Sequence, residues 1–144
     1  DVRFRYACID DGPHHDGGHH ARDIGLRNCC GEMVCWVNQD NSIAPTYLEE
    51  LTRPIDEGFD VVFCRIRHEK HGVIPKHFTI PPICADIDVL GWALRTDLAR
   101  RVGWRGRQYE ADHQFICEVL FHSTPDNPRG PRWLFKPLIL GEHR

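Results

Sequence analysis

Short apolar runs alternate with amphipathic segments along the chain. The apolar runs predict four strands, over residues 4–10, 33–37, 59–66 and 133–140. Apolar positions at helical spacing, several of them followed by a glycine, predict four helices, over residues 21–30, 45–56, 96–102 and 111–121. This order of strands and helices is typical of a layered α/β domain. Because 144 residues is close to the usual size of one domain, we expect residues 1–144 to form a single domain.

Three details of this pattern affect the expected sheet. The run at residues 33–37 is continuously apolar, so it predicts a strand buried on both faces, as in parallel or mixed sheets. Pro137 lacks the backbone N–H that a central strand needs, so residues 133–140 are expected at a sheet edge. Residues 67–85 carry three histidines and three prolines without periodicity, which predicts a long loop.

Composition excludes several classes of function. Eighteen Lys and Arg against twenty-one Asp and Glu give a net charge of −3, without the cationic excess that nucleic-acid binding normally requires. No apolar stretch approaches the roughly 20 residues that span a bilayer, and the N-terminus lacks the pattern of a secretory signal. We therefore expect a cytoplasmic protein without a membrane span. The seven cysteines are irregularly spaced, so free thiols are expected.

Two groups of histidines raise the question of zinc. The histidines of residues 14–20 lie among glycines, which predicts a polar loop that is mobile without ligand and is not a zinc site. The second group consists of Cys64, His68, His71 and His77. It has zinc-type residues within a short span but no paired C-x-x-C motifs, so a structural zinc site is the less favoured interpretation.

A polar turn, residues 38–42, follows the apolar run at 33–37 directly. It places amide and carboxylate groups at the carboxyl end of a predicted strand, where open α/β sheets bind their ligands. The same residue types also form ordinary turns after strands. The local pattern alone leaves both interpretations open.

Four segments of the chain resemble GT-A-type inverting glycosyltransferases of the large family two. The longest reads ARDIGLRNCCGEMVCWVNQDNSIAPTYLEEL and is similar to a family segment with Ala-Arg-Asn-x-Gly, a helix, Gly-Glu, a buried strand, an Asp-rich turn and Pro-x-x-Leu-Glu. The others resemble the acceptor-side segment, the acidic motif that carries the catalytic base, and the closing strand with its histidine. They read VLGWALRTDLARRVGW, YEADHQFICEVL and ILGEHR. Together the resemblance covers roughly residues 20–144.

The resemblance implies a GT-A-like fold, a layered mixed sheet flanked by helices, as in nucleotide-diphospho-sugar transferases. It implies a metal-dependent inverting enzyme that moves a sugar from a nucleotide-sugar donor to a saccharide or other hydroxyl acceptor, with Mn²⁺ or Mg²⁺ as cofactor. Family members usually begin with a strand, a helix and a strand, of which only residues 4–12 resemble the last, so the chain resembles a truncated or unusually small member. There, Asp10 and Asp11 are expected at the nucleotide-sugar site, unless they belong to a coincidental loop.

The resemblance assigns the metal site to Asp40 and His143. The family turn often reads Asp-x-Asp, whereas here Asn38 replaces the first carboxylate, so metal affinity is expected to be weaker. Asn38 is expected to hydrogen-bond a ribose or sugar hydroxyl. Arg22 is expected to bind the diphosphate or the base, with a surface ion pair as its alternative role.

Inversion requires a general base that takes the proton of the acceptor hydroxyl. The resemblance assigns this role to Asp112, and Glu110 positions the acceptor or shares the role; alternatively, both acids only complement a helix dipole. Asp88 and Trp92 are expected to line the acceptor pocket, although such a tryptophan is also typical of a core. The rival function is a non-catalytic GT-A-like domain that binds nucleotide or saccharide, because the first carboxylate and the first strand are missing.

Overall fold

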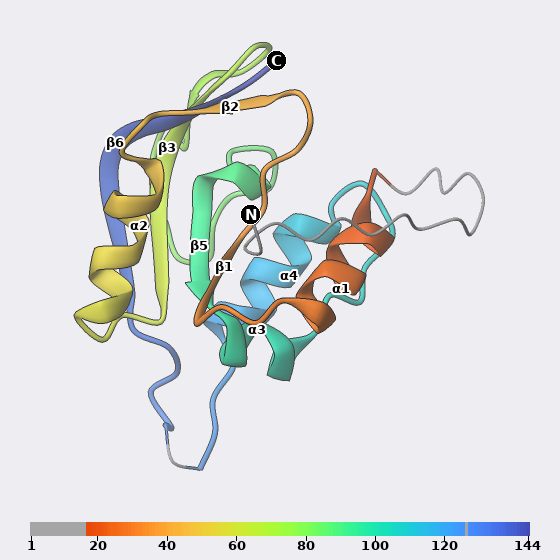
Figure 1. Cartoon of the computed structure of the whole chain (residues 1–144), viewed down its shortest axis with the longest axis vertical. Coiled ribbons are helices and arrows are strands. Elements are labelled where there is room, and N and C mark those ends of the chain that lie inside the picture. Colours follow the sequence, from red (N-terminus) through yellow and green to blue (C-terminus); the bar gives the residue numbers. More distant parts are fainter. Residues whose placement is uncertain (1–16, 126) are drawn as a thin grey trace.

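A curled mixed sheet forms the centre of the computed structural model, which describes residues 17–125 and 127–144 (Figure 1). The strands are β1 (Met33–Cys35), β2 (Asn41–Ile43), β3 (Val61–His68), β4 (Gly72–Ile74), β5 (Trp92–Arg95) and β6 (Trp133–His143). Their order is β1-β5-β3-β6-β2, and β4 pairs with β3 outside this path. The pair β3 and β6 is parallel and the other pairs are antiparallel, which confirms the mixed sheet.

Helices cover both faces of this sheet (Figure 1). They are α1 (His19–Asn28), α2 (Tyr47–Asp56), the 3-10 helix η1 (Val89–Gly91), α3 (Thr96–Val102) and α4 (Ala111–Leu120). Side chains of α1, α3 and α4 form a core on one face, and those of α2 form a core on the other. Strand β3 supplies both cores because its side chains alternate: Val61 and Phe63 join the first, whereas Val62 and Cys64 join the second.

The elements with the strongest local pattern lie where the sequence predicts them. Helix α2 buries Leu51 and Ile55, one turn apart on its apolar face, α3 has the predicted bounds, and α4 ends one residue early. Helix α1 begins earlier than expected, so His19 and His20 are helical and are not part of a loop. The strand predicted at residues 4–10 lies outside the described residues.

The prediction that the last strand lies at a sheet edge is wrong. Strand β6 lies between β3 and β2. Pro137 is tolerated because the ladder is interrupted around it: Phe63 pairs with Phe135, and the next matched pair is Arg65 with Ile139. One residue of β3 therefore lies opposite three residues of β6, a bulge in which the missing N–H of proline breaks no ladder bond.

Two other expectations about strands need correction. Strand β1 is a short edge strand with half-buried Met33 and Cys35, not a strand buried on both faces. The long loop expected at residues 67–85 contains β4, which pairs with the end of β3 as a hairpin. The sequence pattern also missed β2 and β5, which are short and pair with strands distant in the chain.

Two expectations from composition concern cysteines and membranes. The described cysteines are free thiols, as expected: Cys29, Cys30, Cys35, Cys64, Cys84 and Cys117. Within residues 17–125 and 127–144, no helix has the length and apolar character that a bilayer span requires.

Close packing at Gly141 makes a substitution there costly. A Cβ added to Gly141 in β6 would lie 2.6 Å from the Cδ2 atom of buried Leu90 in η1. Gly141→Ala is therefore expected to lower the free energy of unfolding by about 1–3 kcal/mol, measured by urea denaturation. Gly25→Ala is the matched control, because a Cβ on Gly25 of α1 meets nothing within 4 Å. It should raise stability by about 0.5–1 kcal/mol, and equal effects of the two variants would contradict the packing argument.

Candidate active site

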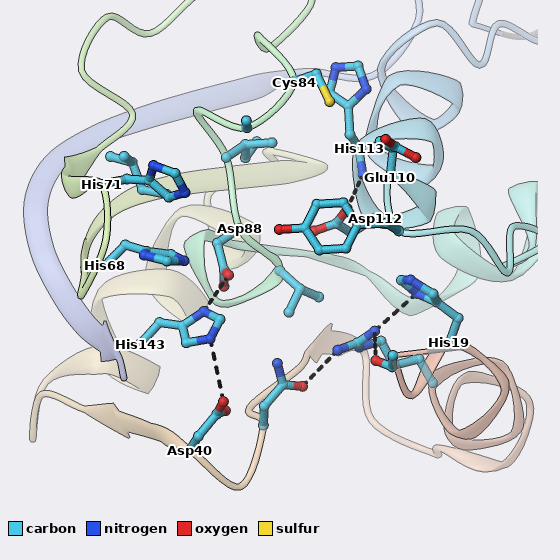
Figure 2. Close-up of a pocket in the computed structure, with 18 of the residues that line it drawn as sticks. His19, Asp40, His68, His71, Cys84, Asp88, Glu110, Asp112, His113 and His143 are labelled. Carbon is cyan, nitrogen blue, oxygen red and sulfur yellow. Dashed lines mark hydrogen bonds and ion pairs between the residues drawn. The ribbon is translucent and has the colours of Figure 1, made fainter. Parts of the chain in front are cut away.

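A cavity of about 350 Å³ collects most of the charged residues singled out in the sequence (Figure 2). Segments from along the chain contribute to it: the start of α1, the turn between β1 and β2, the hairpin of β3 and β4, the segment before η1, the start of α4 and the end of β6. Its polar wall includes Arg22, Asn38, Asp40, His68, His71, Asp88, Glu110, Asp112, His113 and His143. Residues distant in sequence therefore share one site.

Strand pairing brings Asp40 and His143 together. In the antiparallel ladder of β2 and β6, Asn41 is the partner of His143, so Asp40 lies one residue away from the paired position. The Oδ2 atom of Asp40 is 3.4 Å from Nε2 of His143. Two ligand atoms bound about 2.1 Å from one metal ion are separated by about 3–3.4 Å at common coordination angles. The pair therefore fits a divalent cation.

Asp88 contacts the other ring nitrogen of His143. Its Oδ2 atom lies 2.7 Å from Nδ1 of His143, which places His143 between Asp88 and Asp40 (Figure 2). The sequence predicted Asp88 at the acceptor pocket; it lines the cavity, but its carboxylate faces His143.

His68 joins this group through the parallel ladder of β3 and β6, in which it is the partner of His143. One ligand atom from each of His68, Asp88 and His143 lies within 4.8 Å of the others. Burial lowers the pKa of His68, and the neighbouring His143 and His71 lower it further, so its imidazole is neutral at pH 7. Sequence reasoning considered His68 only for zinc, because the parallel register is not visible locally.

Arg22 and Asn38 form a second polar contact in the cavity wall. The Nη2 atom of Arg22 donates to Oδ1 of Asn38 at 2.9 Å, and Nη1 donates to the carbonyl of Gly17 at 3.0 Å. The guanidinium also lies 5.6 Å from the ring centroid of Trp104, within cation–π range. Asn38, expected to bind a hydroxyl of the substrate, thus already accepts a hydrogen bond from Arg22.

A second cavity of about 570 Å³ adjoins the first. Both cavities are lined by Gly17, Arg22, Asn38 and Asp40. The second extends along α1 and the end of β1, whereas the first extends toward α4. The shared residues therefore lie at the boundary between the two cavities.

Asp112 lies at the start of α4, and its Oδ1 atom accepts a hydrogen bond from the backbone N–H of His113 at 2.8 Å. Burial raises the pKa of Asp112, and the charge of Asp88 raises it further, so the raised pKa persists despite that hydrogen bond. Glu110 precedes the helix and is exposed. Both carboxylates line the first cavity, and the environment of Asp112 favours proton uptake.

The structure does not bring Trp92 to the cavity. Its side chain is fully buried in the core between the sheet and α1, α3 and α4, as its apolar neighbours also indicated. Tyr109, which is 87% exposed and which sequence reasoning missed, lines the cavity instead. The sequence signal that could have identified Tyr109 as a site residue is its position next to Glu110 in a polar loop. Asp10 and Asp11 lie outside the described residues.

The fold separates the residues considered for a zinc site, Cys64, His68, His71 and His77. Cys64 is buried in the core beneath α2, where burial raises its pKa to about 12, whereas His68 and His71 line the cavity. His77 is exposed outside the cavity wall. The four residues therefore form no common ligand set.

Comparisons with known proteins agree with this architecture. No curated protein sequence matches the chain. The crystal structure of S. aureus TarS, residues 1–349, is similar with a TM-score of 0.67 and 16% sequence identity, over 89% of this chain and 40% of that one. This likeness confirms the GT-A-like fold, and the chain spans well under half the length of that structure. The sequence profile of Glycosyl transferase family 2 matches residues 6–124, and the chain therefore belongs to this family.

Proposed function

We propose that residues 1–144 form one catalytic domain that transfers a sugar, with inversion, from a nucleotide-sugar donor to a hydroxyl acceptor. The observation that supports this most directly is the shared cavity, in which Asp40 and His143 lie together with Asp112 and Glu110. A cation site and a general base are the two groups that such a transfer needs within reach of one substrate. Family membership supports the reaction class.

The donor diphosphate is proposed to bind at the residues shared by the two cavities. Asp40 and His143 would hold Mn²⁺ or Mg²⁺, which supplies Lewis-acid stabilisation of the diphosphate leaving group. Arg22 adds a fixed positive charge on the same wall, held in place by Asn38. The nucleotide then extends into the cavity along α1, and the sugar faces the cavity beside α4.

The acceptor is proposed to bind on the α4 side. Asp112 takes the proton of the acceptor hydroxyl while the hydroxyl oxygen bonds to the anomeric carbon and the bond from that carbon to the diphosphate oxygen breaks. Glu110 hydrogen-bonds the acceptor, and the exposed ring of Tyr109 offers a face on which a sugar ring packs. Tyr109 thereby takes the part that the sequence assigned to Trp92.

The raised pKa of Asp112 predicts a gain in stability when its charge is removed. A carboxyl group whose pKa is raised on folding stabilises the fold below its ordinary pKa, and that contribution is lost as the pH rises through the folded pKa. Asp112→Asn is therefore expected to raise the free energy of unfolding at pH 7, with the gain shrinking as the pH is lowered toward about 4. Urea denaturation at several pH values measures this change. A loss of stability in Asp112→Asn at pH 7 would contradict the argument that the charge of Asp112 destabilises the fold.

The rival function is a non-catalytic domain that binds nucleotide or saccharide, and Asn38 in place of a carboxylate is the observation that favours it. Incubating the wild-type chain with a panel of nucleotide sugars and Mn²⁺ tests both. Hydrolysis or transfer with any donor supports the enzyme. Nucleotide binding in a thermal-shift screen without turnover of any donor supports the rival.

A further inference from the structure

Asp88 uses both of its carboxylate oxygens inside the protein. Its Oδ1 atom accepts the backbone N–H of Leu90 at 2.8 Å, at the start of η1. Its Oδ2 atom lies 2.7 Å from Nδ1 of His143. The side chain is only 12% exposed, so water competes weakly for these contacts.

We propose that Asp88 is a positioning residue that sets the tautomer of His143, so that Nε2 of His143 keeps its lone pair for a metal ion beside Asp40. The inference rests on the proposed metal role of Asp40 and His143. A carboxylate only accepts hydrogen bonds, so the hydrogen of the short contact belongs to Nδ1 of His143. In the neutral imidazole the other nitrogen, Nε2, is then the one with a lone pair, and it lies 3.4 Å from Oδ2 of Asp40.

The fold holds the three residues in this order. His143 is fixed between its ladder partners in β2 and β3. The segment with Asp88 approaches from η1, and it comes close because Gly141 has no side chain to keep Leu90 away. When a carboxylate, a histidine and a metal ion lie in a line, the carboxylate orients the imidazole ring and raises the basicity of the nitrogen that binds the metal.

The competing arrangement has His68, Asp88 and His143 as three direct ligands, since their ligand atoms cluster within 4.8 Å. The hydrogen bonding of His68 argues against it. The backbone N–H of Lys70 donates to Nδ1 of His68 at 3.1 Å, so the neutral ring carries its hydrogen on Nε2. His68 then has no lone pair for a metal ion while this bond is kept.

Asp88→Asn tests the proposal. The amide oxygen can still accept the N–H of Leu90, which leaves the NH₂ group facing Nδ1 of His143. An NH₂ group donates, so Nδ1 must accept and the hydrogen of His143 moves to Nε2. Nitrogen-15 NMR of the metal-free protein, at a pH at which the imidazole is neutral, should show hydrogen on Nδ1 of His143 in the wild type and on Nε2 in the variant. Mn²⁺ affinity, measured by calorimetry without nucleotide, should fall by about 10–100-fold.

Asp86→Asn is the matched control. It makes the same chemical change two residues away, where Asp86 accepts the N–H of Lys76 outside the cavity wall. Both the tautomer of His143 and the Mn²⁺ affinity should stay as in the wild type. An equal loss of affinity in this control would overturn the proposal in favour of a general charge effect.

Three further results would overturn the proposal. Hydrogen on Nε2 of His143 in the wild type would do so directly. Loss of Mn²⁺ affinity in Asp88→Asn with an unchanged tautomer would make Asp88 a direct ligand. Absence of Mn²⁺ binding by the wild type would remove the metal site altogether. By contrast, intact Mn²⁺ binding without any sugar transfer would contradict only the proposed function.

Discussion

Asp112→Asn is expected to lower sugar transfer by about 10²–10⁴-fold, the usual effect of losing a general base. The amide has the shape and volume of the carboxylate and can still accept the N–H of His113, so the start of α4 should keep its structure. Nucleotide binding should survive, because the proposed diphosphate site uses Arg22, Asp40 and His143. Transfer is measured by product release and nucleotide affinity by calorimetry, on wild type and variant.

Glu118→Gln is the control for this experiment. Glu118 is another carboxylate of α4, but it is not part of the cavity wall. Its loss should leave transfer near the wild-type rate. If Asp112→Asn also transfers at that rate, Asp112 is not the base and Glu110 becomes the candidate. If Asp112→Asn loses both transfer and nucleotide binding, its role is structural or belongs to the donor site.

Asp40→Ala is expected to abolish the joint stabilisation of the fold by Mn²⁺ and a nucleoside diphosphate. In the wild type the two together should raise the melting temperature by more than the sum of their separate effects, because the diphosphate would complete the coordination of a metal ion held by the proposed ligands Asp40 and His143. At ligand concentrations 100 times the dissociation constant, binding adds about 2.7 kcal/mol of stability. For a chain of this size that corresponds to several degrees, at about 2–4 °C per kcal/mol.

The substitution itself should be mild, because the side chain of Asp40 is 46% exposed and fills no core. Asp56→Ala, at the exposed end of α2, removes the same charge at a residue that is not part of the cavity wall and should retain the joint effect. An unchanged joint effect in Asp40→Ala would show that the turn after β1 does not bind the metal.

Local sequence determined the helices and the central strand. The spacing of Leu51 and Ile55 in α2, and the apolar faces of α3 and α4, are formed by residues that neighbour each other along one helix. The apolar residues of β3 identify the strand that both cores require. The polar turn with Asp40 and the acidic start of α4 were also visible, because each lies within a few residues of a recognisable element.

Only the tertiary structure decided which of these residues meet. Whether Asp88 faces an acceptor or His143 depends on how η1 crosses β6, and whether His68 joins them depends on a parallel register between strands far apart in the chain. Trp92 and Tyr109 are both aromatic, but the tertiary structure buries the first in the core and leaves the second exposed at the cavity.

The position of β6 inside the sheet was also decided by the tertiary structure. The sequence shows Pro137 and its missing N–H, which excludes regular pairing at that residue. It does not show that a bulge removes the need for that N–H, because the bulge is a property of the ladder with β3. The sequence alone therefore determined the kinds of elements and the chemistry they carry. Pairing between strands decided which of those groups share a site, because it depends on contacts between residues distant in the chain.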